Sequence, residues 1–276
     1  MNTSSLQIFI AALLATGFWV RAADAAGRAS EPFDYFVNNW NVVGLKDYPR
    51  GARVTPDNRI FLAGSNTTVQ VRFGRTLTAL SRQQSKLAFD GWMPIMVIVA
   101  DDGPVHYEFT YWATPMPDVK DWRKAFDWPT EGENFLVWVR YMATNRSDKP
   151  AEAKVDVGLD PKAPVHPNVE APTEPVVDPL QHGSYSLAKV LSPGEKVEGA
   201  ARFAFFAVKD PAALNKADYQ LWFQRTIKYW HGLEDSFATI QVPCRKATDA
   251  LQAAHVCQLI ANDRGEVRGG EGFYDV

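Results

Sequence analysis

The stretch Trp92–Thr114, WMPIMVIVADDGPVHYEFTYWAT, decides the fold class of this chain. It holds two runs rich in Val, Ile, Tyr, Phe and Thr, the residue types that favour strands. Asp102-Gly103 lies between the runs, and this turn chemistry matches the twist of two paired strands. The stretch therefore predicts an antiparallel hairpin.

Strand signals continue on both sides of this hairpin, from Phe33 to Phe206. Three further runs bounded by turn residues are TTVQVRFGRTLTAL, NFLVWVRYMATN and AEAKVDVGLD. In Phe135–Met142 both alternating faces are largely apolar, whereas a strand with water on one side would alternate more cleanly. We expect this strand to lie between two layers, in a mainly β fold built as a large antiparallel β-sandwich.

A proline-rich segment, residues 160–181, interrupts the strand signals, because its frequent prolines exclude regular structure. A long surface loop within one sandwich is favoured over a hinge between domains, since strand character resumes in SYSLAKVLSPGEKVEGAARFAFFAV. There LSPGEK predicts a tight turn between two runs that finish a sheet.

An amphipathic helix follows the strands. Its apolar positions recur at three-and-four spacing, at Tyr219, Trp222, Phe223, Thr226, Ile227 and Trp230. We expect this aromatic stripe to pack in the core rather than to stack on sugars. Asp210-Pro211 upstream is typical of a helix cap followed by Pro at the first helical position.

A second helix, beginning near Ala247, is apolar or small on most of its sides. One face carries Ala250, Leu251, Ala254, Cys257, Gln258 and Ala261, and Val256, Leu259 and Ile260 extend it. Such a helix is expected to pack among several other helices, and only one other convincing helix precedes it. The apolar surface of this helix exceeds what one other helix can cover, which predicts that the sequence is one part of a longer protein.

The first residues predict export. The uncharged apolar run Leu6–Val20 precedes Ala23-Asp24-Ala25, a pattern typical of a signal peptide over residues 1–25. Its fifteen residues are short for a membrane span, which needs about 20, although an anchored helix remains the alternative. A secreted or periplasmic protein without a membrane span is expected after the signal is removed.

Composition and motifs argue against several classes of function. A net charge of −3 predicts no basic face for nucleic acid. With five His, two Cys and no Cys/His cluster, we expect no metal and no cofactor. Cys244 and Cys257 are too far apart along a helix for a disulfide, so buried thiols are expected.

Two sequons and two tryptophans offer further hypotheses. Asn66-Thr67-Thr68 and Asn145-Arg146-Ser147 match glycosylation sequons. Trp122 and Trp128 are candidate sugar-stacking residues, with packing as the favoured interpretation.

The order of parts resembles the six-hairpin glycosidases, the glucoamylase-like superfamily. The matching features are Trp230, the pair Val242-Pro243 and the glycine-rich loop from Gly269 to Tyr274. These enzymes join an N-terminal β-sandwich through a helical linker to an (α/α)6 barrel. The resemblance implies a sandwich at 26–209, a linker at 210–240 and the start of an α/α toroid at 241–276.

The resemblance implies an exported glycoside hydrolase that acts on oligo- or polysaccharide. Hydrolysis needs two carboxyl groups, which we expect in the rest of the barrel, so no residue here is assigned as catalytic and this chain alone is expected to be inactive. Glu271, Phe273, Tyr274 and Asp275 are candidate substrate-binding residues by position. A non-catalytic carbohydrate-binding or scaffold protein and a polysaccharide lyase with a toroid remain alternatives, and the substrate sugar is not fixed by fold.

Overall fold

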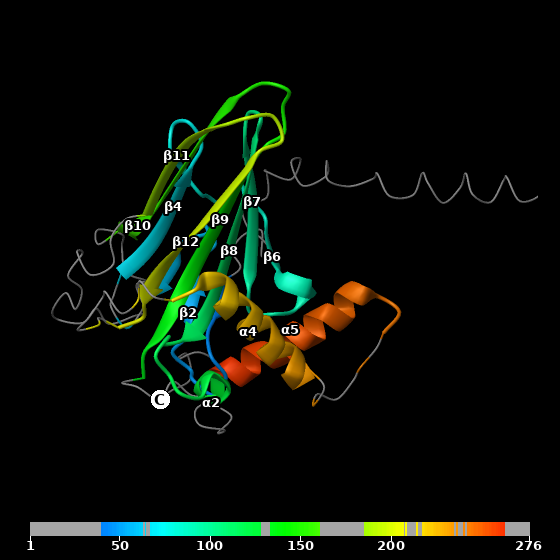
Figure 1. Ribbon diagram of the computed structural model, residues 1–276. Coiled ribbons are helices and arrows are strands. Elements are labelled where there is room, and N and C mark those ends of the chain that lie inside the picture. The colour runs from blue at the N-terminus through cyan, green and yellow to red at the C-terminus, as the bar shows by residue number, and fades with distance from the viewer. Residues whose placement is uncertain are drawn as a thin grey trace, which may run out of the picture. The chain divides into compact units, whose positions relative to one another are not determined.

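The computed structural model is shown in Figure 1. It describes residues 40–62, 64, 67–127, 133–160, 185–206, 208, 214, 217–234, 236, 240 and 242–262. The predicted signal peptide, residues 161–181 of the proline-rich segment and the pair Asp210-Pro211 lie outside the described residues. The described residues belong to one unit, Asn38–Val276.

Two antiparallel sheets make up most of this unit, which confirms the mainly β, antiparallel fold class. The first has the order β1-β2-β3-β4-β10-β11, with β5 beside β4. Its strands are β1 (Asn41–Val43), β2 (Ala52–Val54), β3 (Ile60–Leu62), β4 (Thr67–Phe73), β5 (Thr78–Ala79), β10 (Ala151–Asp160) and β11 (Tyr185–Leu191). The second has the order β12-β9-β8-β7-β6, with β6 (Lys86–Ala88), β7 (Met96–Asp102), β8 (Val105–Pro115), β9 (Phe135–Asn145) and β12 (Lys196–Ala204).

The sheets pack face to face through aromatic side chains. Phe73 of β4 contacts the rings of Tyr107 and Phe109 of β8, with centroids 5.3 and 6.0 Å away. Tyr185 of β11 meets Phe203 of β12 at 6.0 Å. These contacts join the two sheets as the layers of a sandwich.

The predicted hairpin in Trp92–Thr114 is confirmed as β7 and β8. Asp102 pairs with Val105 across the turn, and Gly103 has φ 58°, a left-handed conformation that glycine adopts without steric cost. Local turn chemistry and strand propensity therefore agree with the observed pairing.

Strand β9 lies between two layers, as its two apolar faces predicted. Val137 and Val139 are fully buried on one side. On the other side Trp138 stacks on Trp112 of β8 at 5.8 Å, and Phe223 from the following helix covers Trp112 at 5.1 Å. The helix thus takes the place of solvent over this half of the sheet.

The LSPGEK turn joins two different sheets, so the prediction that its flanking runs finish one sheet is wrong. β11 pairs with β10 and β12 pairs with β9. Alternation of apolar residues identifies a strand but does not specify its partner strand, which explains the error.

Asn145 forms hydrogen bonds to two connections that run from one sheet to the other, β9–β10 and β11–β12. Its side chain is fully buried, and Nδ2 donates to the carbonyls of Lys149, Leu191 and Ser192 at 2.7, 3.0 and 3.2 Å. Its Oδ1 accepts from the backbone N–H and the hydroxyl of Ser147. The sequon at Asn145 therefore serves as a structural polar centre, and its amide is inaccessible to a glycan.

In the part of the chain that the structure describes, four helical segments follow or interrupt the strands. They are η2 (Phe89–Gly91), α2 (Trp122–Asp127), α4 (Tyr219–Glu234) and α5 (Arg245–Ala261). Asp218 caps α4, because its Oδ1 accepts from the N–H groups of Gln220 and Leu221 at 2.9 and 3.2 Å. This cap and the short helix α2 were missed in the sequence.

Most of the predicted aromatic stripe of α4 is buried, whereas two of its members, Tyr219 and Ile227, are half-buried. Its buried residues are Trp222, Phe223, Thr226, Tyr229 and Trp230. Tyr229 also stacks on Phe126 of α2, with centroids 4.6 Å apart. The helix is therefore part of the core.

One face of α5 docks on the loop between β1 and β2. Ile260 is 2% exposed, and its Cγ2 lies only 3.0 Å from where a Cβ on Gly44 would be placed. The N–H of Asp47 donates to the carbonyl of Leu259 at 2.8 Å. Because Gly44 has no side chain, Ile260 can pack closely against the backbone of the β1–β2 loop.

The opposite face of α5 is exposed, and Leu251 on it is 47% exposed. Cys244 and Cys257 are also exposed and form no disulfide. The prediction of buried thiols is wrong: Cys244 is exposed before the helix begins, and Cys257 is exposed on the flank of α5 beside the buried Val256 and Ile260.

No helix in the described part of the chain is both long and apolar enough to cross a membrane.

Candidate functional site: a cleft between the sandwich and two helices

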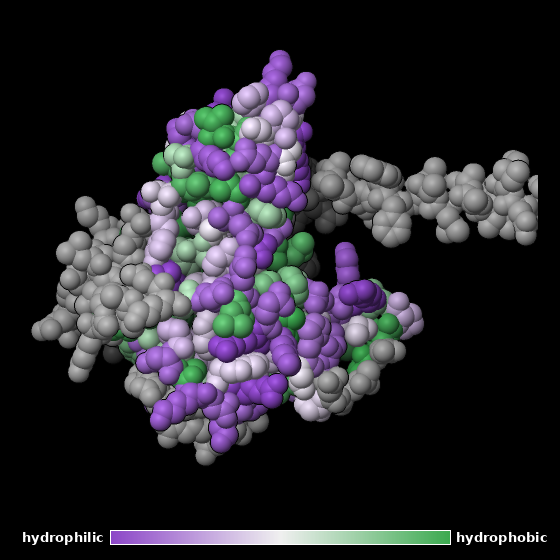
Figure 2. All heavy atoms as spheres, viewed as in Figure 1, coloured by the Kyte–Doolittle hydropathy of each residue, from purple (hydrophilic) through white to green (hydrophobic). Residues whose placement is uncertain are grey.

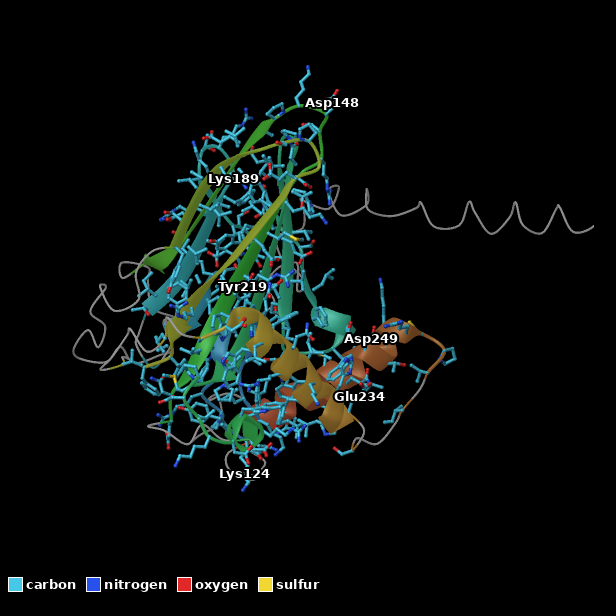
Figure 3. The ribbon with its side chains drawn as sticks, viewed as in Figure 1. Lys124, Asp148, Lys189, Tyr219, Glu234 and Asp249 are labelled. Carbon is cyan, nitrogen blue, oxygen red and sulfur yellow. The ribbon has the colours of Figure 1, made fainter. Side chains whose placement is uncertain are left out.

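A cleft of about 620 Å³ opens where η2, the end of α4 and the first half of α5 meet. Figure 3 labels Glu234 and Asp249 on the two helices that border it. The lining residues are Asp90, Trp92, His231, Glu234, Val242, Pro243, Arg245, Thr248, Asp249 and Gln252. Junctions of this kind are common places for ligand sites.

His231 lies at the centre of the polar contacts. Its Nε2 is 3.3 Å from Oδ2 of Asp90, and its Nδ1 is 3.2 Å from Oε2 of Glu234. Its ring meets Trp92 edge to face at 5.8 Å. A neutral imidazole has one N–H, so only the protonated ring donates to both carboxylates.

Helix α5 closes the other side of the cleft. Gln252 donates from Nε2 to Oε1 of Glu234 at 2.7 Å. Gly91 has φ 85°, and a Cβ on it would lie 2.6 Å from Oδ2 of Asp249. Glycine at this position therefore allows α5 to approach η2 closely.

The cleft combines hydrogen-bond acceptors, donors and an aromatic side. The side chains of Asp90, Glu234 and Asp249 are 46%, 36% and 21% exposed, so their oxygens are accessible. Carboxylate, amide and imidazole groups around a ring suit a ligand with several hydroxyl groups. Within the described ranges, no group of three or more His, Cys, Asp or Glu is arranged to hold a metal ion.

A second cleft, of about 510 Å³, lies where the start of α4 crosses β9 and β12. Glu198 accepts there from the hydroxyl of Tyr219 at 2.8 Å and from Nε2 of Gln220 at 3.1 Å. Burial, together with the bond to Glu198, raises the pKa of the Tyr219 hydroxyl, which therefore remains a donor at neutral pH. Arg140 lines the same cleft and pairs with Glu108 at 3.3 Å.

The four predicted substrate-binding residues, Glu271, Phe273, Tyr274 and Asp275, lie outside the described residues, as does Trp128. The structure places Val242 and Pro243, two of the residues that carried the family resemblance, in the lining of the first cleft. Trp230, the third, is fully buried in the core.

Only one sequence signal points to the first cleft: His231 and Glu234 share a helix face at i and i+3 spacing. Asp90 and Asp249 come from distant parts of the chain, and only tertiary folding brings them together.

The ring of Trp122, a candidate for sugar stacking, is already in contact with two cations. The guanidinium carbons of Arg123 and Arg225 lie 5.2 and 5.5 Å from its centroid. Its ring is therefore engaged by arginine side chains rather than presented bare to a neutral sugar.

No protein-family model matches this chain, and no curated protein matches it.

Proposed function

We propose that this chain forms the N-terminal part of an exported glycoside hydrolase of the six-hairpin type. In this proposal the sandwich is a rigid base, α4 is the linker and α5 is the first helix of an α/α toroid. The enzyme acts on oligo- or polysaccharide, and its catalytic carboxylates lie outside the described residues.

The observation that carries the proposal is the exposed face of α5. Its exposed members with small or apolar side chains are Ala247, Ala250, Leu251, Ala254 and Cys257. Leu251 and, before the helix, Ile240 and Val242 are 47%, 57% and 37% exposed. Figure 2 shows hydrophobic residues at the surface over this part of the molecule.

A helix with apolar residues on opposite sides is typical of a helix packed between partners. In the described residues the inner side of α5 has its partner in the β1–β2 loop, through Ile260 and Gly44. Small side chains on the outer side allow another helix to approach closely. An α/α toroid supplies such helices.

A second candidate function is a carbohydrate-binding protein without catalysis. It is favoured by the cleft of about 620 Å³, which described residues of η2, α4 and α5 line with carboxylate, amide and imidazole groups. In that case the hydroxyl groups of a sugar would meet Asp90, Glu234 and Gln252, and no bond would be cleaved.

The test is an incubation of the natural protein with a panel of neutral and acidic oligosaccharides. New reducing ends without ultraviolet-absorbing products support the hydrolase. Reducing ends accompanied by an unsaturated, ultraviolet-absorbing product identify a lyase instead. Binding without any new reducing ends would reject the proposal in favour of the carbohydrate-binding protein.

A paired variant sharpens this test. Leu251→Glu places a charge on the outer face of α5, so the natural protein should lose activity as the packing of its toroid is disturbed. Lys149→Glu is the control, because Lys149 is an exposed residue of the β9–β10 connection, next to Asp148 and far from α5 in Figure 3. Equal activity of the two variants would count against a helix partner at this face.

A further inference from the structure

We propose that Trp122, Arg123 and Arg225 form a binding site for the negatively charged groups of an acidic polysaccharide. Arg123 belongs to α2 and Arg225 to α4, and both guanidinium groups contact the ring of Trp122, at 5.2 and 5.5 Å from its centroid. Arg225 also lies 4.8 Å from the ring centroid of Trp222. The site therefore joins two elements that are about a hundred residues apart in sequence.

The two positive charges are held close together. Since both guanidinium carbons lie within 5.5 Å of one ring centroid, they are at most about 11 Å apart. Like charges at this range repel each other. Contact with electron-rich rings compensates this repulsion only in part.

Neither guanidinium forms an ion pair with another residue in the part of the chain that the structure describes. The acidic residues beside them are engaged elsewhere. Asp121 accepts from the backbone N–H groups of Arg123 and Lys124, at 3.2 and 3.3 Å, and so caps α2. Asp127 accepts from the hydroxyl of Tyr229 and lies 3.6 Å from Lys46.

The arrangement suits anionic groups. An arginine stacked on a ring keeps its N–H edge available for bidentate bonds to carboxylate or sulfate. Lys120, Lys124 and Lys228 are exposed on the same two helices or just before them, and add positive charge. Figure 3 shows Lys124 projecting outward from α2.

The choice of an acidic polysaccharide rests on the proposed function. A polymer with a carboxylate on each sugar presents several negative groups to the two guanidiniums at once, and each charge-assisted bond adds affinity. The net charge of −3 makes this a local basic cluster rather than the broad basic face that nucleic acid requires.

Affinity electrophoresis of the full chain through gels containing polygalacturonate tests the inference, with dextran as the neutral polymer. We expect retardation by polygalacturonate and none by dextran, weakened by added salt. Arg123→Gln and Arg225→Gln should each raise the dissociation constant about tenfold or more. Arg225→Lys, which keeps the charge but loses the planar fork, should give an intermediate value.

The matched control is Arg146→Gln, in the connection between β9 and β10 near Asp148, which Figure 3 shows at the end of the molecule far from Lys124. This variant should bind polygalacturonate as the unaltered chain does. Equal binding by Arg123→Gln, Arg225→Gln and Arg146→Gln would overturn the proposal. Tighter binding of a single-stranded oligonucleotide than of polygalacturonate would also overturn it.

The unfolding midpoint of each variant shows whether that variant is folded. If Arg225→Gln does not fold, the dissociation constant of Arg225→Lys tests the role of Arg225 instead. The outcome is separable from the proposed function, because binding is measured without cleavage. Binding of polygalacturonate by this chain through these residues, together with no cleavage of any glycan by the natural protein, supports this site and contradicts the hydrolase.

Discussion

The docking of α5 on the sandwich depends on Ile260, and its truncation gives a quantitative test of the fold. Ile260 is 2% exposed, whereas Leu251 on the same helix is 47% exposed. Ile260→Ala removes three buried carbons, at about 0.8 kcal/mol each, and adds a cavity cost of about 1 kcal/mol. The expected loss is about 3 kcal/mol. Leu251→Ala removes the same number of carbons from an exposed position, and should cost less than about 0.5 kcal/mol.

Hydrogen exchange is the appropriate assay, because α5 can open without unfolding of the sandwich. A loss of about 3 kcal/mol corresponds to exchange roughly a hundredfold faster at the amides of α5 in Ile260→Ala. The amides of β8 and β9 should be unaffected if the opening is local. Equal exchange of α5 in the Ile260→Ala and Leu251→Ala variants would refute the docking described here.

The remaining predictions concern four other places in the chain. Asn145→Ala removes the side-chain donor to three carbonyls and the acceptor of Ser147, and should lower the free energy of unfolding in urea by about 3 kcal/mol; a loss under about 1 kcal/mol would contradict the structural role of Asn145. Gly91→Ala should destabilise the protein by about 2 kcal/mol through its positive φ and its clash with α5, whereas Gly232→Ala in α4, with open space around it, should be neutral or slightly stabilising. Burial lowers the pKa of Lys86 from 10.5 to about 8, so the unfolded chain holds this proton more tightly than the folded chain. The free energy of unfolding should therefore rise with pH between these two values. Urea unfolding of the Lys86→Met variant should lack this rise, and the same pH profile in both proteins would show that Lys86 does not cause it. If the proposed signal peptide is removed, N-terminal sequencing of the natural protein should begin near Ala26, and a sequence that starts at Met1 would argue against the signal peptide.

Features encoded locally were predictable from the sequence. The hairpin of β7 and β8 follows from an Asp-Gly turn between two strand-like runs, and the buried stripe of α4 follows from its three-and-four spacing. The double burial of β9 followed from the absence of clean alternation. In each case neighbouring residues carry the signal, so no knowledge of distant contacts was needed.

Features that depend on distant contacts were not predictable. The partners of β11 and β12 lie in different sheets, and alternation is the same in either arrangement. Asn145 carries a sequon that suggests the surface, but five hydrogen bonds across two connections bury it. α2 has only six residues, too few for a helical period to be recognised.

The candidate site illustrates the same limit. His231 is brought to Asp90 by the docking of α4 beside η2, and Asp249 reaches the cleft only because Gly91 has no side chain. No residue spacing in the sequence predicts that His231 lies beside Asp90 or that Asp249 lies beside Gly91. The four residues predicted from family resemblance lie outside the described residues, and their role stays a prediction.

The rate at which Cys257 reacts with iodoacetamide in the natural protein shows whether further helices cover α5. Cys257 is exposed on the outer face of α5, where we propose that the toroid packs. Mass spectrometry should find this thiol labelled readily in the separate 276-residue chain and at least tenfold more slowly in the folded natural protein. Equal rates in the two would show that nothing covers this face of α5, and would contradict the proposed toroid.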